Sequence, residues 1–275
     1  MNIIKFLESL ANQGAVESLN AKGSRRDSFT QFGKMGATAA VAAVPFSMLF
    51  SQKASAATAA AAAETPVSAL QLALTLEYLE SEFYSNALDE NFLSADERIV
   101  IEQISRHETA HVTFLKNTLN TLRATVPAMP NFDFTAGGNF NDVFSNPATF
   151  FAVAQAFEDT GVRAYKGQAG NLISEKALLT AALQIHSVEA KHASQIRRMR
   201  GLKGWIVGNQ RGDGMPEQTQ AVYNGEENVN QAGFMTNNVS GTFSPPLSAT
   251  GGTESFDEPM SGATATTIAS LFIRS

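Results

Sequence analysis

An internal repeat at an offset of 81 residues limits the possible folds of this chain more than any other feature of its sequence. In each half a Glu is followed seven positions later by a Tyr, and Glu-x2-His begins 31 positions after the first Glu. The repeated residues are Glu77, Tyr84, Glu108 and His111 in the first half, and Glu158, Tyr165, Glu189 and His192 in the second. The agreement predicts two equivalent halves that each supply half of one pseudo-two-fold site.

Each half has the pattern of two helices. Thr65 and Asn146 are good N-cap residues, and each precedes a proline, which suits the first helical position. The segment "SADE" at 94–97 has the form of a capping box. Apolar residues then recur at alternating spacings of three and four, as in a helix that buries one face. The sequence therefore predicts four helices within residues 65–202.

The links between these helices predict how the helices are arranged. The first and third links are short, which favours antiparallel neighbours. The segment "VPAMPNFDFTAGGNFNDVFS" carries prolines and paired glycines and is expected to form a long loop. Two dozen extended residues reach ~80 Å, whereas a helix of about 25 residues is only about 38 Å long. The second and third helices can therefore run in the same direction, and the predicted fold is an all-α four-helix bundle with one long crossover.

The repeated acidic residues and histidines fall on helix faces that otherwise carry Leu, Ile, Phe and Ala. An unpaired carboxylate buried there would cost several kcal/mol, whereas two divalent cations would cancel the charges of four carboxylates. Glu and His at i and i+3 lie on one helix face and present two ligands together. Oxygen-rich coordination with one imidazole per metal suits iron or manganese. Two iron or two manganese ions would therefore fit among the repeated acidic and imidazole groups.

This pattern resembles the ferritin-like di-metal carboxylate superfamily over residues 65–202. The resemblance implies that Glu77 and Glu158 are terminal ligands and that Glu108 and Glu189 bridge or chelate the metals. It also implies that each of the two repeated histidines caps one metal.

The same resemblance places Tyr84 and Tyr165 beside the ligands, as hydrogen-bonding or redox-active groups. The segments "RRMRGLKGW" at 197–205 and "ESFDEP" at 254–259 are similar to those of exported ferritin-like or desiccation-related proteins. We therefore expect this chain to be closest to that group.

Two other acidic residues compete with Glu77 for the first ligand position. The repeat counterparts of Glu80 and Glu82 are Gly161 and Arg163, which cannot play the same role, so Glu77 is preferred. Glu80 lies near the same helix face and is the alternative ligand.

Several further residues are interpreted as structural. His107 and His186 break the repeat and are expected to be solvated or hydrogen-bonded rather than ligands. Trp205 is interpreted as a packing residue. The basic run Arg197–Lys203 is interpreted as a solvated face that interacts favourably with the end of its helix.

Composition excludes several function classes. The chain contains no cysteine, so disulfides, thiolate nucleophiles and zinc fingers are excluded. The formal net charge is −6, and nucleic acid is not the expected partner, because binding it usually requires a basic face.

The first 56 residues have the pattern of a twin-arginine-type export signal. The segment "SRRDSF" at 24–29 precedes an apolar run of small residues, and "ASA" at 54–56 supplies a cleavage pattern. A retained membrane anchor is the alternative, although Pro45 interrupts the run. We expect a periplasmic or otherwise exported protein with no stable membrane span after cleavage, and with a linker at 57–64.

Residues 203–275 show no sustained period. We expect an extended C-terminal arm that packs on the bundle or on a partner, with a short terminal helix capped by Ser261. Disorder in the middle of the arm is the alternative.

Three functions fit these features. The first is an exported di-iron or di-manganese oxidoreductase that reacts with O2 or hydrogen peroxide, as a ferroxidase or in a manganese-catalase-like reaction. The second is a non-enzymatic envelope protein for stress or desiccation, with a structural or vestigial metal site. Iron storage in a cage is the third and the weakest. Homo-oligomers are compatible with all three.

Overall fold

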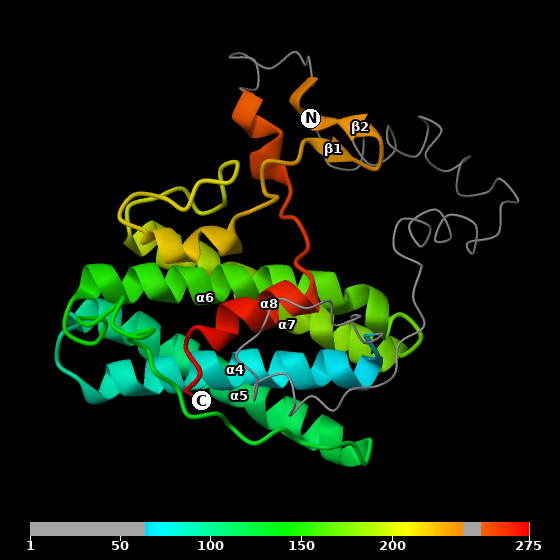
Figure 1. The fold of residues 1–275 in the computed structure, drawn as a ribbon, viewed down its shortest axis with the longest axis horizontal. Helices are drawn as coiled ribbons and strands as arrows, with labels where there is room; N and C mark the ends of the chain where they lie inside the picture. Colours follow the sequence, from blue (N-terminus) through cyan, green and yellow to red (C-terminus); the bar gives the residue numbers. More distant parts are fainter. Residues whose placement is uncertain (1–63, 239–248, 275) are drawn as a thin grey trace, which may run out of the picture. The chain divides into compact units, whose positions relative to one another are not determined.

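The computed structural model describes residues 64–238 and 249–274, which are mainly helical (Figure 1). The predicted all-α bundle is confirmed. Its four long helices are α4 (Pro66–Asp89), α5 (Ala95–Thr121), α6 (Pro147–Gln168) and α7 (Lys176–Met199). The predicted export signal at 1–56 lies outside the described residues, as does the linker up to residue 63.

The predicted helix starts are confirmed by their capping contacts. Thr65 and Ser68 form a capping box at the start of α4, in which the Ser68 hydroxyl accepts from the Thr65 amide at 2.7 Å. Ser94 and Glu97 form a second box before α5, with the Glu97 carboxylate 2.8 Å from the Ser94 amide nitrogen. The side-chain oxygen of Asn146 caps α6. These contacts satisfy amides that the first helical turn leaves without partners.

The connections place the helices as the link lengths predicted. A five-residue link, 90–94, joins α4 to α5, and residues 169–175, which include the 3-10 turn η3 (Ala169–Leu172), join α6 to α7. The crossover at 122–146 returns along the bundle, so that α5 and α6 run in the same direction (Figure 1). The crossover also adds Phe134, Phe140 and Val143 to the core.

The apolar core lies in two clusters along the bundle. One gathers aromatic residues from the later part of α4 and the early part of α6, where Phe83 stacks on Phe150 with 4.8 Å between ring centroids. The other includes Leu74 of α4, Leu115 of α5 and Ile185 of α7. Fully burying a Leu or Phe side chain contributes roughly 1.5–3 kcal/mol. Together the two clusters pack the four helices against one another.

The C-terminal arm, residues 203–274, packs on the bundle where it is described. Its elements are the 3-10 turns η4 (Glu217–Val222), η5 (Thr236–Asn238), η6 (Ala249–Gly251) and η7 (Thr253–Ser255), the antiparallel hairpin β1 (Asn230–Gln231) and β2 (Phe234–Met235), and helix α8 (Gly262–Ser270). Ser261 caps α8, as predicted, and α8 contacts α4 and α6. Phe132 of the crossover forms a β-bridge with Ile273.

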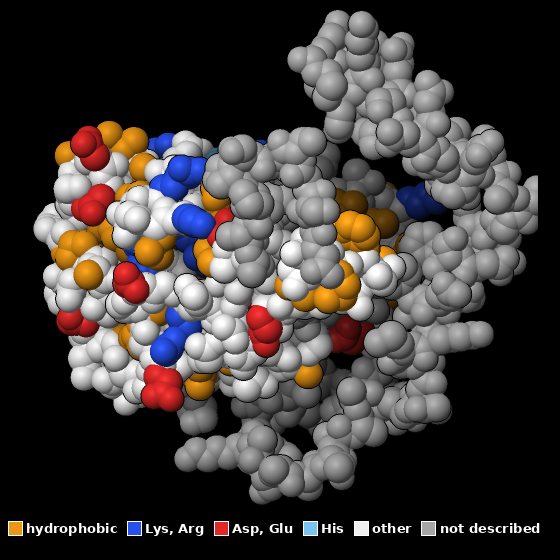
Figure 2. All heavy atoms as spheres, turned by 90° about the horizontal axis from the view of Figure 1, so that it is seen from above, with side chains coloured by type: hydrophobic (Ala, Val, Ile, Leu, Met, Phe, Trp, Pro, Cys, Tyr) orange, Lys and Arg blue, Asp and Glu red, His pale blue; other side chains and the backbone are white. Residues whose placement is uncertain are grey.

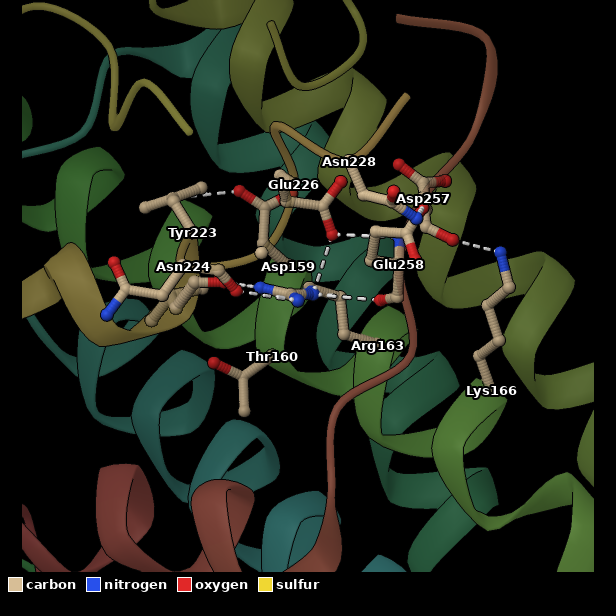
Figure 3. Close-up of polar contacts among 12 residues, drawn as sticks. Asp159, Thr160, Arg163, Lys166, Tyr223, Asn224, Glu226, Asn228, Asp257 and Glu258 are labelled. Carbon is tan, nitrogen blue, oxygen red and sulfur yellow. Dashed lines mark hydrogen bonds and ion pairs between the residues drawn. The ribbon is translucent and has the colours of Figure 1, made fainter. Parts of the chain in front are cut away.

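A buried arginine anchors this arm to α6 (Figure 3). The guanidinium of Arg163 donates to the backbone carbonyls of Val222, Asn224 and Glu258, and its Nε lies 2.7 Å from the carboxylate of Glu226. Both charged side chains are almost fully buried. Because the arginine satisfies three arm carbonyls at once, the arm is part of the folded body.

A second buried pair shows that the basic run at 197–203 was misinterpreted in part. Arg197 is not solvated: it is 3% exposed and forms a two-atom ion pair with Asp159 of α6. The Tyr223 hydroxyl donates to the same carboxylate at 2.8 Å, and Arg197 lies over the Tyr223 ring. Desolvation of Asp159 on the densely packed α6 requires a buried cation beside it.

Trp205, interpreted from the sequence as a packing residue, also makes a polar contact at the surface. The Trp205 side chain is 44% exposed, and its indole N–H donates to Glu254 at 2.8 Å, beside the Lys203–Glu254 ion pair. The polar end of the ring is thus used at the surface and not in the core.

Figure 2 shows one face of the molecule, on which acidic, basic and apolar side chains are interspersed. Among the described residues, no helix combines the length and the apolar character that crossing a bilayer requires.

Candidate metal centre

The structure brings the six predicted ligands together, one or two from each helix of the bundle. The four carboxylates are fully buried, His192 is buried, and His111 is partly buried. They form two overlapping groups: Glu77, Glu108, His111 and Glu189, and Glu108, Glu158, Glu189 and His192. Within each group the potential ligand atoms lie within 4.8 Å of one another. Glu108 and Glu189 belong to both groups.

Helical spacing explains this arrangement. On α5 and on α7 the Glu and the His are three residues apart, so that one turn presents both toward the bundle interior. Glu77 on α4 and Glu158 on α6 face them from the other two helices. The 81-residue offset therefore corresponds to two helix pairs that each supply three of the six residues.

The imidazoles point their Nδ1 atoms into the two groups. His111 Nδ1 lies 3.0 Å from Glu108 and 3.2 Å from both Glu77 and Glu189. His192 Nδ1 lies 2.8 Å from Glu108 Oε1 and 3.4 Å from Glu158 Oε2, but is not aligned for a hydrogen bond with either. Both histidines therefore face carboxylate oxygens from more than one helix.

Several buried polar atoms at the site lack a hydrogen-bond partner. Among the described residues these atoms include Oε1 of Glu108, Oε2 of Glu158, both carboxylate oxygens of Glu189 and Nδ1 of His192. An unpartnered buried polar atom is costly and rare in native proteins. Carboxylate oxygens and imidazole nitrogens are the donors that iron and manganese accept. The donor set therefore fits a pair of such ions.

The pKa values of most of these carboxyl groups are raised, which means that their charged forms are unstable without cations. Burial raises the pKa of Glu77 to about 8 and also raises the pKa of Glu158. Burial, together with the neighbouring carboxylates, raises the pKa of Glu189 well above its ordinary value. Burial alone would raise the pKa of Glu108 too, but a hydrogen bond from His111 and the charge of the nearby His192 lower it to about 2.

The pKa values of the two histidines are raised by the same carboxylates, so the histidines hold their protons more strongly. Burial alone would lower their pKa values, but hydrogen bonds to Glu108 and Glu77 and the nearby carboxylate of Glu189 raise the pKa of His111 to about 12. The negative charges of Glu158 and Glu108 raise the pKa of His192 to about 11. In the metal-free protein, protonated imidazoles are thus the cations that partly balance the carboxylates.

The two repeated tyrosines contact the site crosswise. The Tyr84 hydroxyl donates to Glu158 at 2.5 Å, and the Tyr165 hydroxyl donates to Glu77 at 2.5 Å. Both rings are buried. Each tyrosine therefore orients the acidic residue of the other repeat, not the one that precedes it in the sequence.

His107 links the site to the surface. Its Nδ1 lies 2.9 Å from His192 Nε2, and the two rings stack with centroids 5.1 Å apart. The expectation of a hydrogen-bonded histidine is met, but its partner is a candidate ligand. An open pocket of about 470 Å³ between α5 and α7 is lined by His107, His192, Gln103, Arg106 and Lys191, among others. His186, by contrast, belongs to neither group.

Glu80 is the acidic residue whose position the sequence pattern left unresolved. It is 2% exposed and lies beside Glu189, one helical turn from Glu77. Burial and the surrounding carboxylates raise its pKa well above the ordinary value.

Comparison with known families agrees with this geometry. The family model of the ferritin-like domain matches residues 65–202. The chain belongs to the ferritin-like family. The matched ferritin-like segment begins at the N-cap residue of α4 and ends just beyond α7, so it contains all six candidate ligands and both tyrosines. No curated protein sequence matches the chain.

Proposed function

We propose that this ferritin-like protein binds two iron or two manganese ions among α4–α7 and acts as an oxidoreductase on O2 or hydrogen peroxide. The observation that carries the proposal is the pair of four-residue groups that share Glu108 and Glu189, with unpartnered buried oxygens at their centre. Four carboxylates balance two divalent cations, and a core that buries such charges without cations would be destabilised.

Each residue has a distinct role in this proposal. Glu77 and Glu158 each belong to one group and would bind one ion, whereas Glu108 and Glu189 would bridge the two. His111 and His192 would give up the protons on Nδ1 and bind through those atoms. Tyr84 and Tyr165 would hold the two outer carboxylates in position through their hydroxyls.

The bound ions would supply the redox and Lewis-acid chemistry. The protein's residues would exclude water from the buried carboxylates and fix their orientation. The pocket between α5 and α7 is wide enough for O2 or hydrogen peroxide and extends to His192. Two reactions fit this environment: oxidation of ferrous iron by O2, and manganese-catalase-like disproportionation of peroxide.

Replacing a shared carboxylate tests this proposal. Glu108→Ala removes a member of both groups, so we expect loss of metal and at least a hundredfold loss of O2 or peroxide consumption. Glu82→Ala is the matched control, because Glu82 lies on α4 outside both groups and should leave both properties unchanged. Consumption in Glu108→Ala that equals the wild type would contradict the assignment.

A non-enzymatic envelope protein for stress or desiccation, with metal in a structural role, is the second candidate. The observation that favours it is the arm, which is tied to α6 through the buried Arg163 although none of the six candidate ligands lies in it. In that case metal would raise the melting temperature without supporting turnover. Turnover that depends on Glu108 would exclude it.

We also propose that the protein is exported to the periplasm through the paired arginines at 25–26, as its resemblance to exported ferritin-like and desiccation-related proteins suggests. Replacing both arginines with lysine should keep the full-length precursor in the cytoplasm. Unchanged export of that variant would argue against a twin-arginine route.

A further inference from the structure

Glu80 is a buried acid surrounded by other carboxylates. Its side chain is 2% exposed, and the charged groups that act on it most strongly are other carboxylates, those of Glu189, Glu158 and Glu108. It lies on α4 three residues after Glu77, on the face that carries the candidate ligands. A buried carboxylate among like charges is destabilising unless a cation balances it. Its retention therefore requires an explanation beyond packing.

The repeat shows what accommodates this residue. The counterpart of Glu80, 81 positions later, is Gly161 on α6. A methyl group at position 161 would lie 3.2 Å from Glu80 Oε1 and 3.0 Å from Glu189 Oε2. The space that a side chain would fill on α6 is thus taken by the carboxylates of Glu80 and Glu189. Both oxygens of Glu189 are themselves without a hydrogen-bond partner among the described residues.

We propose that Glu80 is a seventh, asymmetric ligand of the metal centre, and that Gly161 is required to make room for it. This inference rests on the proposed function, because it assumes that the centre holds metal ions. The ligand that Glu80 would take is a hard cation that prefers oxygen donors, such as iron or manganese. The two halves of the repeat then differ, since only α4 supplies this additional carboxylate.

The fifth carboxylate changes the charge balance of the site. Four carboxylates neutralise two divalent ions, whereas five leave one negative charge with two neutral imidazoles. Five carboxylates instead neutralise one divalent and one trivalent ion. Glu80 therefore favours the more oxidised state of the centre, because an added negative charge in a buried site stabilises added positive charge. Removing that charge should raise the reduction potential of the metal pair.

Glu80→Gln is the first variant to test, because it keeps the size of the side chain and removes the charge. We expect it to bind one of the two metals at least tenfold more weakly, as measured by titration against a chelator, and to have a higher reduction potential. Glu82→Gln is the control on the same helix and should match the wild type in both measurements. The melting temperature of metal-free Glu80→Gln should equal that of the wild type, since the raised pKa of Glu80 keeps it neutral there and the amide has the same size.

Gly161→Ala tests the same relationship from α6. The added methyl group would crowd the carboxylates of Glu80 and Glu189 and should weaken the same metal position even though both acids remain. Glu80→Gln and Gly161→Ala proteins that both bind two metals with wild-type affinity and potential would overturn the inference and leave the proposed function intact. A wild-type protein that binds no metal would instead overturn the proposed function itself.

Discussion

The hydroxyl of Tyr165 on α6 donates a 2.5 Å hydrogen bond to Glu77 on α4, and so joins the two repeats across the centre of the bundle. Tyr84 makes the equivalent bond to Glu158. In the sequence each Glu precedes its own Tyr by seven residues, but in space each pairs with the other half. The crosswise pairing fixes the outer carboxylates before any metal arrives, which lowers the cost of arranging ligands.

Tyr165→Phe should weaken metal binding without unfolding the bundle. The ring still fills its place in the core, but Glu77 loses the donor that orients it. Loss of such an outer partner costs about 10–100-fold in metal affinity, and we expect this loss at the group that contains Glu77. A calorimetric titration with manganese measures the affinity of each binding step. Two unchanged binding steps in Tyr165→Phe would show that the hydroxyl does not position the ligand.

His107→Phe should affect the other group. Phenylalanine keeps the ring stacked on His192 but cannot hydrogen-bond to Nε2, so the orientation of the imidazole is less restricted. We expect the affinity for the ion at His192 to fall about 10–100-fold, while the ion at His111 is retained. His186→Phe, on α7 but outside both groups, is the control. Equal losses at the two positions would contradict a specific role for His107.

Metal affinity should rise with pH. His111 and His192, with pKa values of about 12 and 11, and Glu77, with a pKa of about 8, hold protons at neutral pH in the metal-free protein. Metal must displace those protons, so that a higher pH reduces the competition. Each proton released makes the apparent affinity roughly tenfold stronger per pH unit. Titrations between pH 6 and 8 in two buffers would reveal proton release; a pH-independent affinity would contradict it.

Arg163→Met should detach the arm from α6. The variant leaves Glu226 buried without its cation and leaves three arm carbonyls without their donor. Removing one partner of a buried ion pair costs about 3–5 kcal/mol. We expect urea unfolding to shift by that amount and proteases to cleave within residues 203–238 sooner.

Two further variants make that experiment specific. Arg198→Met, at an exposed position in the last turn of α7, should leave stability unchanged. The double variant Arg163→Met, Glu226→Gln should recover part of the loss, because the unpaired charge is gone. An arm equally resistant to proteases in Arg163→Met would show that other contacts anchor it.

Local signals made the bundle predictable. Proline after Thr65 and Asn146 and the capping box at Ser94 act within a few residues, so their effects can be read directly from the sequence. The six candidate ligands could also be predicted from the sequence, because acidic residues and histidines on apolar helix faces recur at one offset of 81 residues.

The contacts of the arm were not predictable in the same way, because they pair residues far apart in the chain. Asp159 pairs with Arg197, and Arg163 with Glu226. One signal was available: residues 150–165 are apolar or small at most positions around the whole helix, and all of them are buried. A helix that is apolar on every side must be covered on every side. That requirement, applied to α6, would have indicated that the arm covers it and that Asp159 and Arg163 need buried partners.

The position of Glu80 could not be predicted from the sequence for a different reason. The comparison of the repeats identified Gly161 as its counterpart and treated the mismatch as a reason to discount Glu80. The structure shows that the mismatch is steric complementarity, since the missing side chain on one helix leaves room for the carboxylate of the other. Such complementarity becomes visible only when the two helices face each other.

The central claim is tested most directly by the number of metal ions in protein purified after its own export, determined by elemental analysis beside a Glu108→Ala, Glu189→Ala double variant. These two residues belong to both groups, so the double variant loses the shared carboxylates while α4 and α6 stay unchanged. We predict about two iron or manganese ions per chain in the wild type and none in the double variant. An absence of metal from the folded wild type, or equal metal in both proteins, would contradict a di-metal centre at this site.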